Sequence, residues 1–246
     1  MKGHLNMPDR FGPRGVCAVI IPQQNANMQP EYEIMRPEGI NNQMYRFDIS
    51  VHDKVPEAVL KTMPETHGCF PDMTIVGNSF EMRNVGPEEY ATYRKQLADT
   101  AGDVQFTTAA DGCLAALRTV GAKKIAVLSP MTKEYSESIQ RYYGHYGFEA
   151  PYSAWLHVTD PKNIIKVTVD QILEAFDTDG FGDVDTILHI GGALGLVSML
   201  GELEEKLDRP IVSSNSAAYW YALRKFGIKD TRDDIGKLWT IEDIVE

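Results

Sequence analysis

The chain has 246 residues, 43% of them hydrophobic, which is enough for one large domain or two smaller ones. A formal charge of −11 and a pI near 5.0 argue against nucleic acid or an anionic membrane as partner, because those surfaces attract clustered lysine and arginine. The first residues lack the apolar core of a signal peptide and no segment approaches the ~20 apolar residues of a membrane span, so we expect a cytoplasmic protein.

Short apolar runs alternate with amphipathic segments along the chain, the pattern of βα units around mainly parallel sheets. In chain order, strands are predicted at 15–22, 44–50, 72–78, 123–130, 185–192 and 210–214. Helices are predicted at 53–63, 87–103, 109–120, 132–146, 163–177, 194–206 and 216–226. In the second of these, an apolar stripe at helical spacing follows Pro87 and consists of Tyr90, Tyr93, Leu97 and Ala101.

The sequence nearly repeats itself once. AVIIP (18–22) recurs as AVLSP (126–130), and TTAADGCLAALRTVG (107–121) recurs as SSNSAAYWYALRKFG (213–227). A third pair, TIVGNS (74–79) and TILHIGG (186–192), lies at a similar displacement, although chance matches of common residues are the alternative explanation. The repeat predicts an α/β protein of two similar halves.

We place the first half at residues 1–120, completed by 217–246, and the second half at 121–216. Ligands of open α/β sheets bind beyond the carboxyl ends of the strands. The site is therefore expected in the cleft between the halves.

Four stretches together resemble the aspartate/glutamate racemase superfamily, in its arylmalonate decarboxylase and maleate isomerase branch. They are IPQQNANMQPE (21–31), GNS (77–79), GG (191–192) and VSSNSAAYWYALRKFG (212–227). The resemblance implies two pseudo-symmetric α/β halves, each with a mainly parallel sheet, and a cofactor-free site for a small carboxylate between them. Racemases and isomerases of this superfamily carry one catalytic cysteine per half. The resemblance implies that these two cysteines correspond to the positions of Gly77 and Ile190 here. Arylmalonate decarboxylases resemble this chain at the first position and keep the second thiol.

Neither position holds a cysteine, so two-thiol chemistry is not expected. Cys17 falls inside a predicted strand, Cys113 in the ALRxxG helix and Cys69 before a strand, which is typical of core or near-core residues. Their spacing gives neither a CxxC pair nor a disulfide framework, and no HExxH motif is present. We therefore predict no metal and no cofactor.

Hydrogen-bond donors remain as the means of stabilising a carboxylate or an enolate in the cleft. The expected substrate-binding residues are Asn25, Gly77, Asn78, Ser79, Arg83, Ile190, Gly191, Gly192, Ser214 and Asn215. The resemblance places Asn25 where related isomerases bind the substrate carboxylate. The alternatives are that Ser214 or Asn215 caps a helix, that Asn78 and Ser79 close a turn, and that the glycines only permit positive φ.

Three residues are candidates for moving a proton: His189, Glu81 and Tyr135. His189 has a side chain that ordinarily titrates near neutral pH, although strand alternation turns it away from the face of its neighbour at position 190. Glu81, with Arg83 as a carboxylate clamp, follows the GNS turn, where charges are commonly solvated. Tyr135 lies one helical turn beyond Met131, the position where the resemblance implies a tyrosine, and packing within the helix is its alternative role.

The main functional hypothesis is a lyase, either a decarboxylase or a hydratase, acting on a small carboxylic or dicarboxylic acid. The alternative is a non-catalytic member that binds a small acid, and a minor alternative is an isomerase or racemase with a non-cysteine acid and base. A small carboxylate is the expected partner, with no nucleic acid and no membrane. The sequence leaves open whether the chain forms a homo-oligomer.

Overall fold

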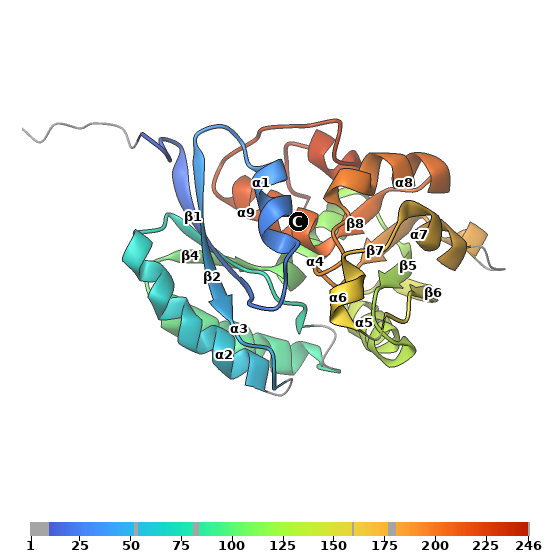
Figure 1. Cartoon of the computed structure of the whole chain (residues 1–246), viewed down its shortest axis with the longest axis horizontal. Coiled ribbons are helices and arrows are strands. Elements are labelled where there is room, and N and C mark those ends of the chain that lie inside the picture. Colours follow the sequence, from blue (N-terminus) through green and yellow to red (C-terminus); the bar gives the residue numbers. More distant parts are fainter. Residues whose placement is uncertain (1–9, 52–53, 81–83, 159, 177–180, 246) are drawn as a thin grey trace, which may run out of the picture.

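Two four-stranded sheets form the framework of the computed structural model, which describes residues 10–51, 54–80, 84–158, 160–176 and 181–245 (Figure 1). The first sheet has the order β2-β1-β3-β4, with β1 (Gly15–Pro22), β2 (Ile40–Phe47), β3 (Met73–Val76) and β4 (Gln105–Thr108). The second has the order β6-β5-β7-β8, with β5 (Lys124–Ser129), β6 (Glu149–Trp155), β7 (Thr186–His189) and β8 (Ile211–Ser213). All neighbouring strands in both sheets are parallel, and the strand order is the same in each. The predicted fold class is confirmed.

Helices connect the strands and cover the sheets (Figure 1). The α-helices are α1 (Met28–Met35), α2 (Val55–Thr62), α3 (Pro87–Ala101), α4 (Ala109–Thr119), α5 (Lys133–His145), α6 (Pro161–Ile164), α7 (Val169–Ala175), α8 (Leu200–Leu207) and α9 (Ser214–Lys225). The 3-10 helices are η2 (Met63–Cys69), η4 (Phe181–Asp183), η5 (Val197–Met199) and η6 (Lys237–Thr240). As predicted, Pro87 opens α3 and the apolar stripe of this helix is buried.

The structure differs from the predicted elements at the polar and short segments. The sequence pattern misses β4, which has only four residues, and β6, an edge strand that contains Pro151 and leaves most of its side chains partly exposed. It also misses α1, which begins among polar residues and includes Pro30. The predicted helix at 163–177 is two helices, α6 and α7, and the one at 194–206 consists of η5 and α8.

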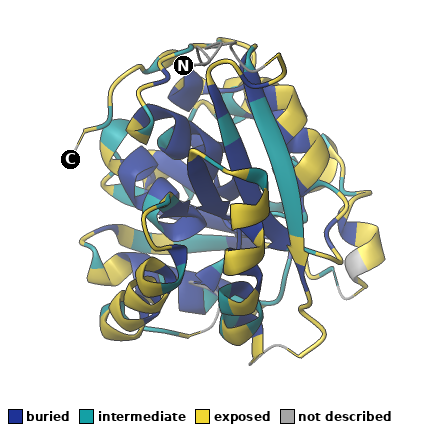
Figure 2. Cartoon of the chain, turned by 90° about the vertical axis from the view of Figure 1, so that its left-hand side faces the viewer, coloured by how far each residue is buried: buried dark blue, intermediate teal, exposed yellow. Residues whose placement is uncertain are grey.

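One hydrophobic core joins the two sheets. It contains Ile75 of the first sheet and Val127 of the second, with α4 and α9 packed against each other between them. Gly112 of α4 permits this close packing, because a Cβ at that position would lie 2.8 Å from the Cα of Ala218 in α9. A smaller core covers the other face of the second sheet under α6, α7 and α8. The inner strands β1, β3, β5 and β7 are accordingly buried, the edge strands β2 and β6 are partly exposed, and the peripheral helices turn one side to solvent (Figure 2).

The strand directions determine where a site can form. Because the strands of each sheet are parallel, their carboxyl ends lie at a common edge, and the segments that follow β1, β3, β5 and β7 emerge there. These segments hold the motifs IPQQN, GNS, SPM and IGG. The division of the chain at residues 120 and 216 stays a prediction.

Two further properties concern the described part of the chain. No helix in it combines the length and apolar character needed to cross a membrane. Its histidine, cysteine, aspartate and glutamate side chains form no group of three or more that could hold a metal ion.

Candidate active site

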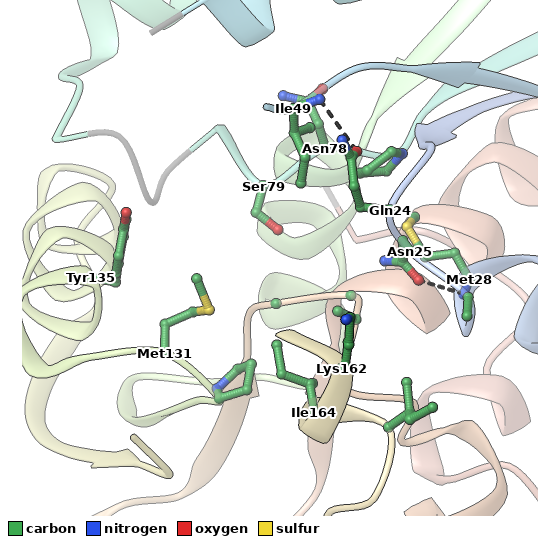
Figure 3. A pocket seen from close by; sticks show the side chains of 18 of the residues that line it. Gln24, Asn25, Met28, Ile49, Asn78, Ser79, Met131, Tyr135, Lys162 and Ile164 are labelled. Carbon is green, nitrogen blue, oxygen red and sulfur yellow. Dashed lines mark hydrogen bonds between the residues drawn. The ribbon is translucent and has the colours of Figure 1, made fainter. Parts of the chain in front are cut away.

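A pocket of about 550 Å³ lies where the turns of the two sheets meet (Figure 3). The first sheet and its connections contribute Pro22, Gln24, Asn25, Ala26, Met28, Phe47, Ile49, Gly77, Asn78 and Ser79. The second contributes Pro130, Met131, Tyr135, Asp160, Lys162, Ile164, Ile165, Gly191, Gly192 and Ala193. Most of these residues are apolar or glycine, and a few polar groups stand among them. Such a lining is typical of a small-molecule site.

Asn25 lies in the turn after β1 and is buried. Its Oδ1 accepts hydrogen bonds from the backbone N–H groups of Asn27 at 2.9 Å and Met28 at 3.0 Å, which fixes the start of α1. The Nδ2 points into the pocket and has no acceptor in the described part of the chain (Figure 3). The Asn25 side chain therefore offers an N–H donor to a ligand.

The turn after β3 brings three more predicted residues to the pocket. Asn78 is 5% exposed, and its Nδ2 has no hydrogen-bond partner among the described residues. The Ser79 hydroxyl is directed toward the middle of the pocket (Figure 3). Gly77 allows the turn to approach α1, since a Cβ there would lie 2.7 Å from the Cε of Met28.

The turn after β7 forms the opposite wall. Gly191 has a φ of +128°, and a Cβ on it would lie 2.6 Å from the Cδ of Pro130. A Cβ on Gly192 would collide with the side-chain amide of Asn215. The backbone N–H groups of both glycines have no acceptor within the described residues, so they are available as donors.

Three predicted binding residues lie behind this wall and do not line the pocket: Ile190, Ser214 and Asn215, all of them buried. The Asn215 Nδ2 donates to the carbonyl oxygen of Gly192 at 2.9 Å and to Glu31 Oε2 at 2.6 Å. Both amide hydrogens are thus engaged. The Ser214 hydroxyl has no partner among the described residues, and the N-cap position of α9 belongs to the preceding residue.

His189 is fully buried at the end of β7 and does not line the pocket either. Its Nδ1 lies 3.0 Å from Ser213 Oγ, so that hydroxyl binds the imidazole and does not cap α9. Burial lowers the pKa of His189 to about 3, which keeps the ring neutral at physiological pH.

Tyr135 of α5 lines the pocket on the second-sheet side (Figure 3). Met131 lies at the end of β5 and contributes an apolar side chain to the same side. Glu81 and Arg83 lie outside the described residues.

Sequence reasoning missed Lys162. It belongs to the short helix α6, lines the pocket and extends into it (Figure 3). No acidic partner of its ammonium group is found in the described part of the chain. The signal in the sequence was the run DPKN, in which Asp160 caps a helix that Pro161 begins.

A second missed residue is Glu31 of α1, which is 5% exposed and accepts the hydrogen bond from Asn215. Nothing in its local sequence distinguishes it from the exposed Glu33, because both follow the same polar run. Only the packing of α1 against residues more than 160 positions away separates the two.

The sequence model of the arylmalonate decarboxylase family matches residues 86–239, from the start of α3 to η6, which is more than half of the chain. The chain belongs to the arylmalonate decarboxylase family. No curated protein matches it.

Solved structures share the fold of this arylmalonate decarboxylase family member. A maleate cis-trans isomerase from Nocardia farcinica, solved with a covalently bound succinylcysteine intermediate, is 16% identical with a TM-score of 0.78, over 92% of this chain and 98% of the other. A maleate isomerase from Pseudomonas putida, solved with maleate, is 18% identical with a TM-score of 0.78, over 94% and 99%. An arylmalonate decarboxylase is 21% identical with a TM-score of 0.75, over 91% and 98%.

None of the three cysteines of this arylmalonate decarboxylase family member lines the pocket. Cys17 and Cys113 are fully buried, and burial raises the pKa of the Cys17 thiol far above its usual value. Cys69 ends η2 and is partly buried. A buried thiol with a raised pKa, such as that of Cys17, is a weak nucleophile at neutral pH.

Proposed function

We propose that the chain is a cofactor-independent lyase that acts on a small carboxylic or dicarboxylic acid without using a thiol. One observation carries the proposal: a mainly apolar pocket whose polar groups, among the described residues, are chiefly hydrogen-bond donors and one ammonium group. The Asp160 carboxylate also lines the pocket, and it accepts a hydrogen bond from the Lys162 backbone N–H. Membership of the arylmalonate decarboxylase family favours decarboxylation over hydration as the reaction.

The donors of the turns after β1, β3 and β7 would hold one carboxylate of the substrate. The Asn25 and Asn78 amides and the Ser79 hydroxyl lie on one side, and the N–H groups of Gly191 and Gly192 lie on the other. Donors that are fixed before the reaction stabilise the charge of an enediolate better than water does, because they need no reorganisation. In this proposal Lys162 supplies the positive charge that draws the acid into the pocket.

The carboxylate that leaves would lie against the apolar lining formed by Met28, Met131 and Ile164. Its bond to the α-carbon breaks, CO2 departs, and the bonding electron pair is delocalised as an enediolate onto the retained carboxylate. An apolar surface solvates a carboxylate poorly and neutral CO2 well, which favours this step. A proton then forms the new bond to the α-carbon.

Tyr135 is our candidate for the proton donor, because its side chain lines the pocket whereas His189 is buried away from it. A proton donor positioned beside the α-carbon contributes about 10²–10⁴-fold to the rate. Tyr135→Phe should therefore lower kcat by a factor in that range and leave KM nearly unchanged.

The proposal is tested by incubating the protein in D2O with malonate, phenylmalonate and maleate, and following CO2 release and deuterium incorporation by NMR. CO2 release with deuterium at the α-carbon supports the decarboxylase. Binding without turnover favours the small-acid-binding alternative, and an acid panel that neither binds nor reacts overturns the proposed site.

An isomerase is the second candidate. Two of the three solved structures described above are maleate isomerases, and one of them was solved with maleate. Conversion of maleate to fumarate in the same panel would favour it. The absence of a thiol in the pocket is the observation that places it second.

A further inference from the structure

Helix α1 follows strand β1 of the first sheet. Its side chains form hydrogen bonds with the segment that follows β7 of the second sheet. The Asn27 Nδ2 donates to the carbonyl oxygen of Ala193 at 2.6 Å, and the Val197 N–H donates to Glu31 Oε1 at 2.6 Å. Glu31 Oε2 accepts from Asn215, which also holds the Gly192 carbonyl oxygen. We call the side chains of Asn27, Glu31 and Asn215 the α1 latch.

The α1 latch holds a wall of the pocket. Gly192 and Ala193, whose carbonyl oxygens accept two of its hydrogen bonds, both line the pocket. Gly195 lets the loop pass close to the latch, because a Cβ there would lie 3.3 Å from both Asn27 Nδ2 and Glu31 Oε1. The position of the wall therefore depends on these polar contacts as well as on apolar packing.

The Glu31 carboxylate is suited to its partners only when it is ionised. Both of its oxygens accept hydrogen bonds from N–H donors, so a proton on Oε2 would face the Asn215 Nδ2, which is also a donor. Asn215 would have to turn its own oxygen toward the protonated acid. The Gly192 carbonyl oxygen would then lose its donor.

Burial raises the pKa of Glu31 to about 7, although the hydrogen bonds from Asn215 and Val197 act in the opposite direction. The two forms of the carboxyl group are therefore both accessible near neutral pH. Its neighbour on the same helix, Tyr32, has a pKa raised well above the usual value by burial, and so does Tyr219 on α9. Neither phenol titrates in that range.

The remaining charged groups packed on α1 do not bond to the Glu31 carboxylate. Among the described residues, the charged side chains that bond to this helix are Arg36 at its C-cap, which pairs with Glu33, Arg46 on β2 and Arg232 near the C-terminus. Helix η5, which supplies the Val197 N–H, carries no titratable side chain. Proton uptake by Glu31 therefore acts mainly on its two hydrogen-bond donors, the Asn215 Nδ2 and the Val197 N–H.

From this geometry we propose that ionised Glu31 is a positioning residue for the pocket: it orients Asn215 and so fixes the Gly192–Ala193 wall, and the wall loosens when Glu31 takes up a proton. The proposal deepens the proposed function, on which its link to ligand binding rests. The wall coupling itself requires no ligand.

The coupling is tested on the full-length, isotope-labelled protein by NMR between pH 5.5 and 8.5. The Glu31 carboxyl carbon, the Asn215 side-chain amide and the Gly192 backbone amide should shift with one common midpoint in the wild-type protein. In Glu31→Gln the two amide titrations should vanish. They should persist in Glu33→Gln, a control at an exposed carboxylate on the same helix. Amide signals that do not follow the Glu31 carboxyl group in the wild-type protein would overturn the proposal, even if no variant folded.

Malonate binding, measured by calorimetry at pH 6 and pH 8, extends the test to the pocket. Ionisation of malonate itself affects every variant equally, so the ratio of affinities is compared between proteins. The ratio of the malonate affinity at pH 8 to that at pH 6 should be about ten times larger in the wild-type protein and in Glu33→Gln than in Glu31→Gln. This is the effect expected for the loss of a charged hydrogen bond. Equal ratios in all three proteins refute the link to binding. No malonate binding to the wild-type protein counts against the proposed function, while the NMR titration still decides the coupling.

Discussion

At the scale of single residues, the pocket is a set of donors that the backbone holds in place. The Asn25 Oδ1 accepts hydrogen bonds at the start of α1, and its Nδ2 points into the pocket. Gly191 and Gly192 present backbone N–H groups. The ammonium group of Lys162 differs from these, since it reaches the pocket from a short helix on the second-sheet side. The contribution of the Lys162 charge to binding can therefore be measured separately from that of the neutral donors by substituting Lys162.

Lys162→Met is expected to weaken malonate binding by about five- to tenfold, because one charged partner of the acid is lost while the apolar stem is kept. Isothermal titration calorimetry measures the change, and its size should shrink as salt is added. Lys166→Met is the matched control, because Lys166 is exposed and bonds to Asn163 outside the pocket. Equal affinities for wild type and Lys162→Met would remove Lys162 from the site.

Iodoacetamide should leave malonate binding and any turnover intact. Cys69 is the thiol that we expect to be labelled, because Cys17 and Cys113 are fully buried and thiols react as thiolates. Mass spectrometry of the labelled protein identifies the modified residue. Inactivation that malonate prevents would place a thiol in the mechanism and contradict the proposed chemistry.

At the scale of elements, the equivalent helices α4 and α9 pack against each other between the sheets. Gly112 makes the crossing close, because the Ala217 carbonyl oxygen and the Ala218 backbone nitrogen would both lie 2.9 Å from a Cβ at that position. These neighbours are backbone atoms and cannot move aside alone. The two halves are therefore joined by a tightly packed helix pair.

Gly112→Ala should lower the free energy of unfolding by about 1–3 kcal/mol, since the overlap outweighs the higher helix propensity of alanine. Gly144→Ala, in α5 where an added Cβ would meet open space, should raise it by up to ~1 kcal/mol. Urea unfolding of both variants gives the comparison. A Gly112→Ala protein as stable as the wild type would show that the helix pair can separate at little cost.

The elements that could be predicted from sequence are strands marked by a short apolar run and helices whose apolar residues repeat at helical spacing. The strand predicted at 15–22 coincides with β1, and the helix predicted at 87–103 is α3, which ends at Ala101. Three elements were missed. β4 is only four residues long, and β6 is a partly exposed edge strand. α1 is held by contacts without a local pattern, the hydrogen bonds to a loop more than 160 residues away. The turn residues of the candidate site could be predicted from motifs, whereas Glu31 had no local signal. Lys162 had one, the helix start DPKN, which the predicted helix at 163–177 left out.

At the scale of the whole molecule, two buried groups oppose each other in the dependence of stability on pH. Burial raises the pKa of Glu31 to about 7, so the native state binds a proton more tightly than the unfolded chain, and stability falls as pH rises from about 4.5 to 7. Burial lowers the pKa of His189 to about 3, so its contribution is present above pH 6.5 and is lost as pH falls through that value toward 3. Between about pH 4.5 and 6.5 the two contributions partly cancel.

Compared with Glu31→Gln, the wild-type protein should lose stability as pH rises from about 4.5 to 7, with a slope of up to ~1.4 kcal/mol per pH unit. Compared with His189→Asn, it should gain stability over pH 4.5 to 6.5. Urea titrations at half-unit pH steps measure both differences. A wild-type and a Glu31→Gln profile that run parallel would show that Glu31 titrates alike in the folded and unfolded chains.

The α1 latch also bears on the order in which the chain acquires its structure. Its hydrogen bonds join residues 166 and 184 positions apart, so they form only after the second sheet has been made. During synthesis Glu31 emerges early and stays hydrated and ionised until Asn215 and Val197 arrive. Dehydration of that carboxylate is then a late event, and such long-range contacts are typical of slow final folding steps. Completion of the pocket wall therefore requires that both sheets have already formed.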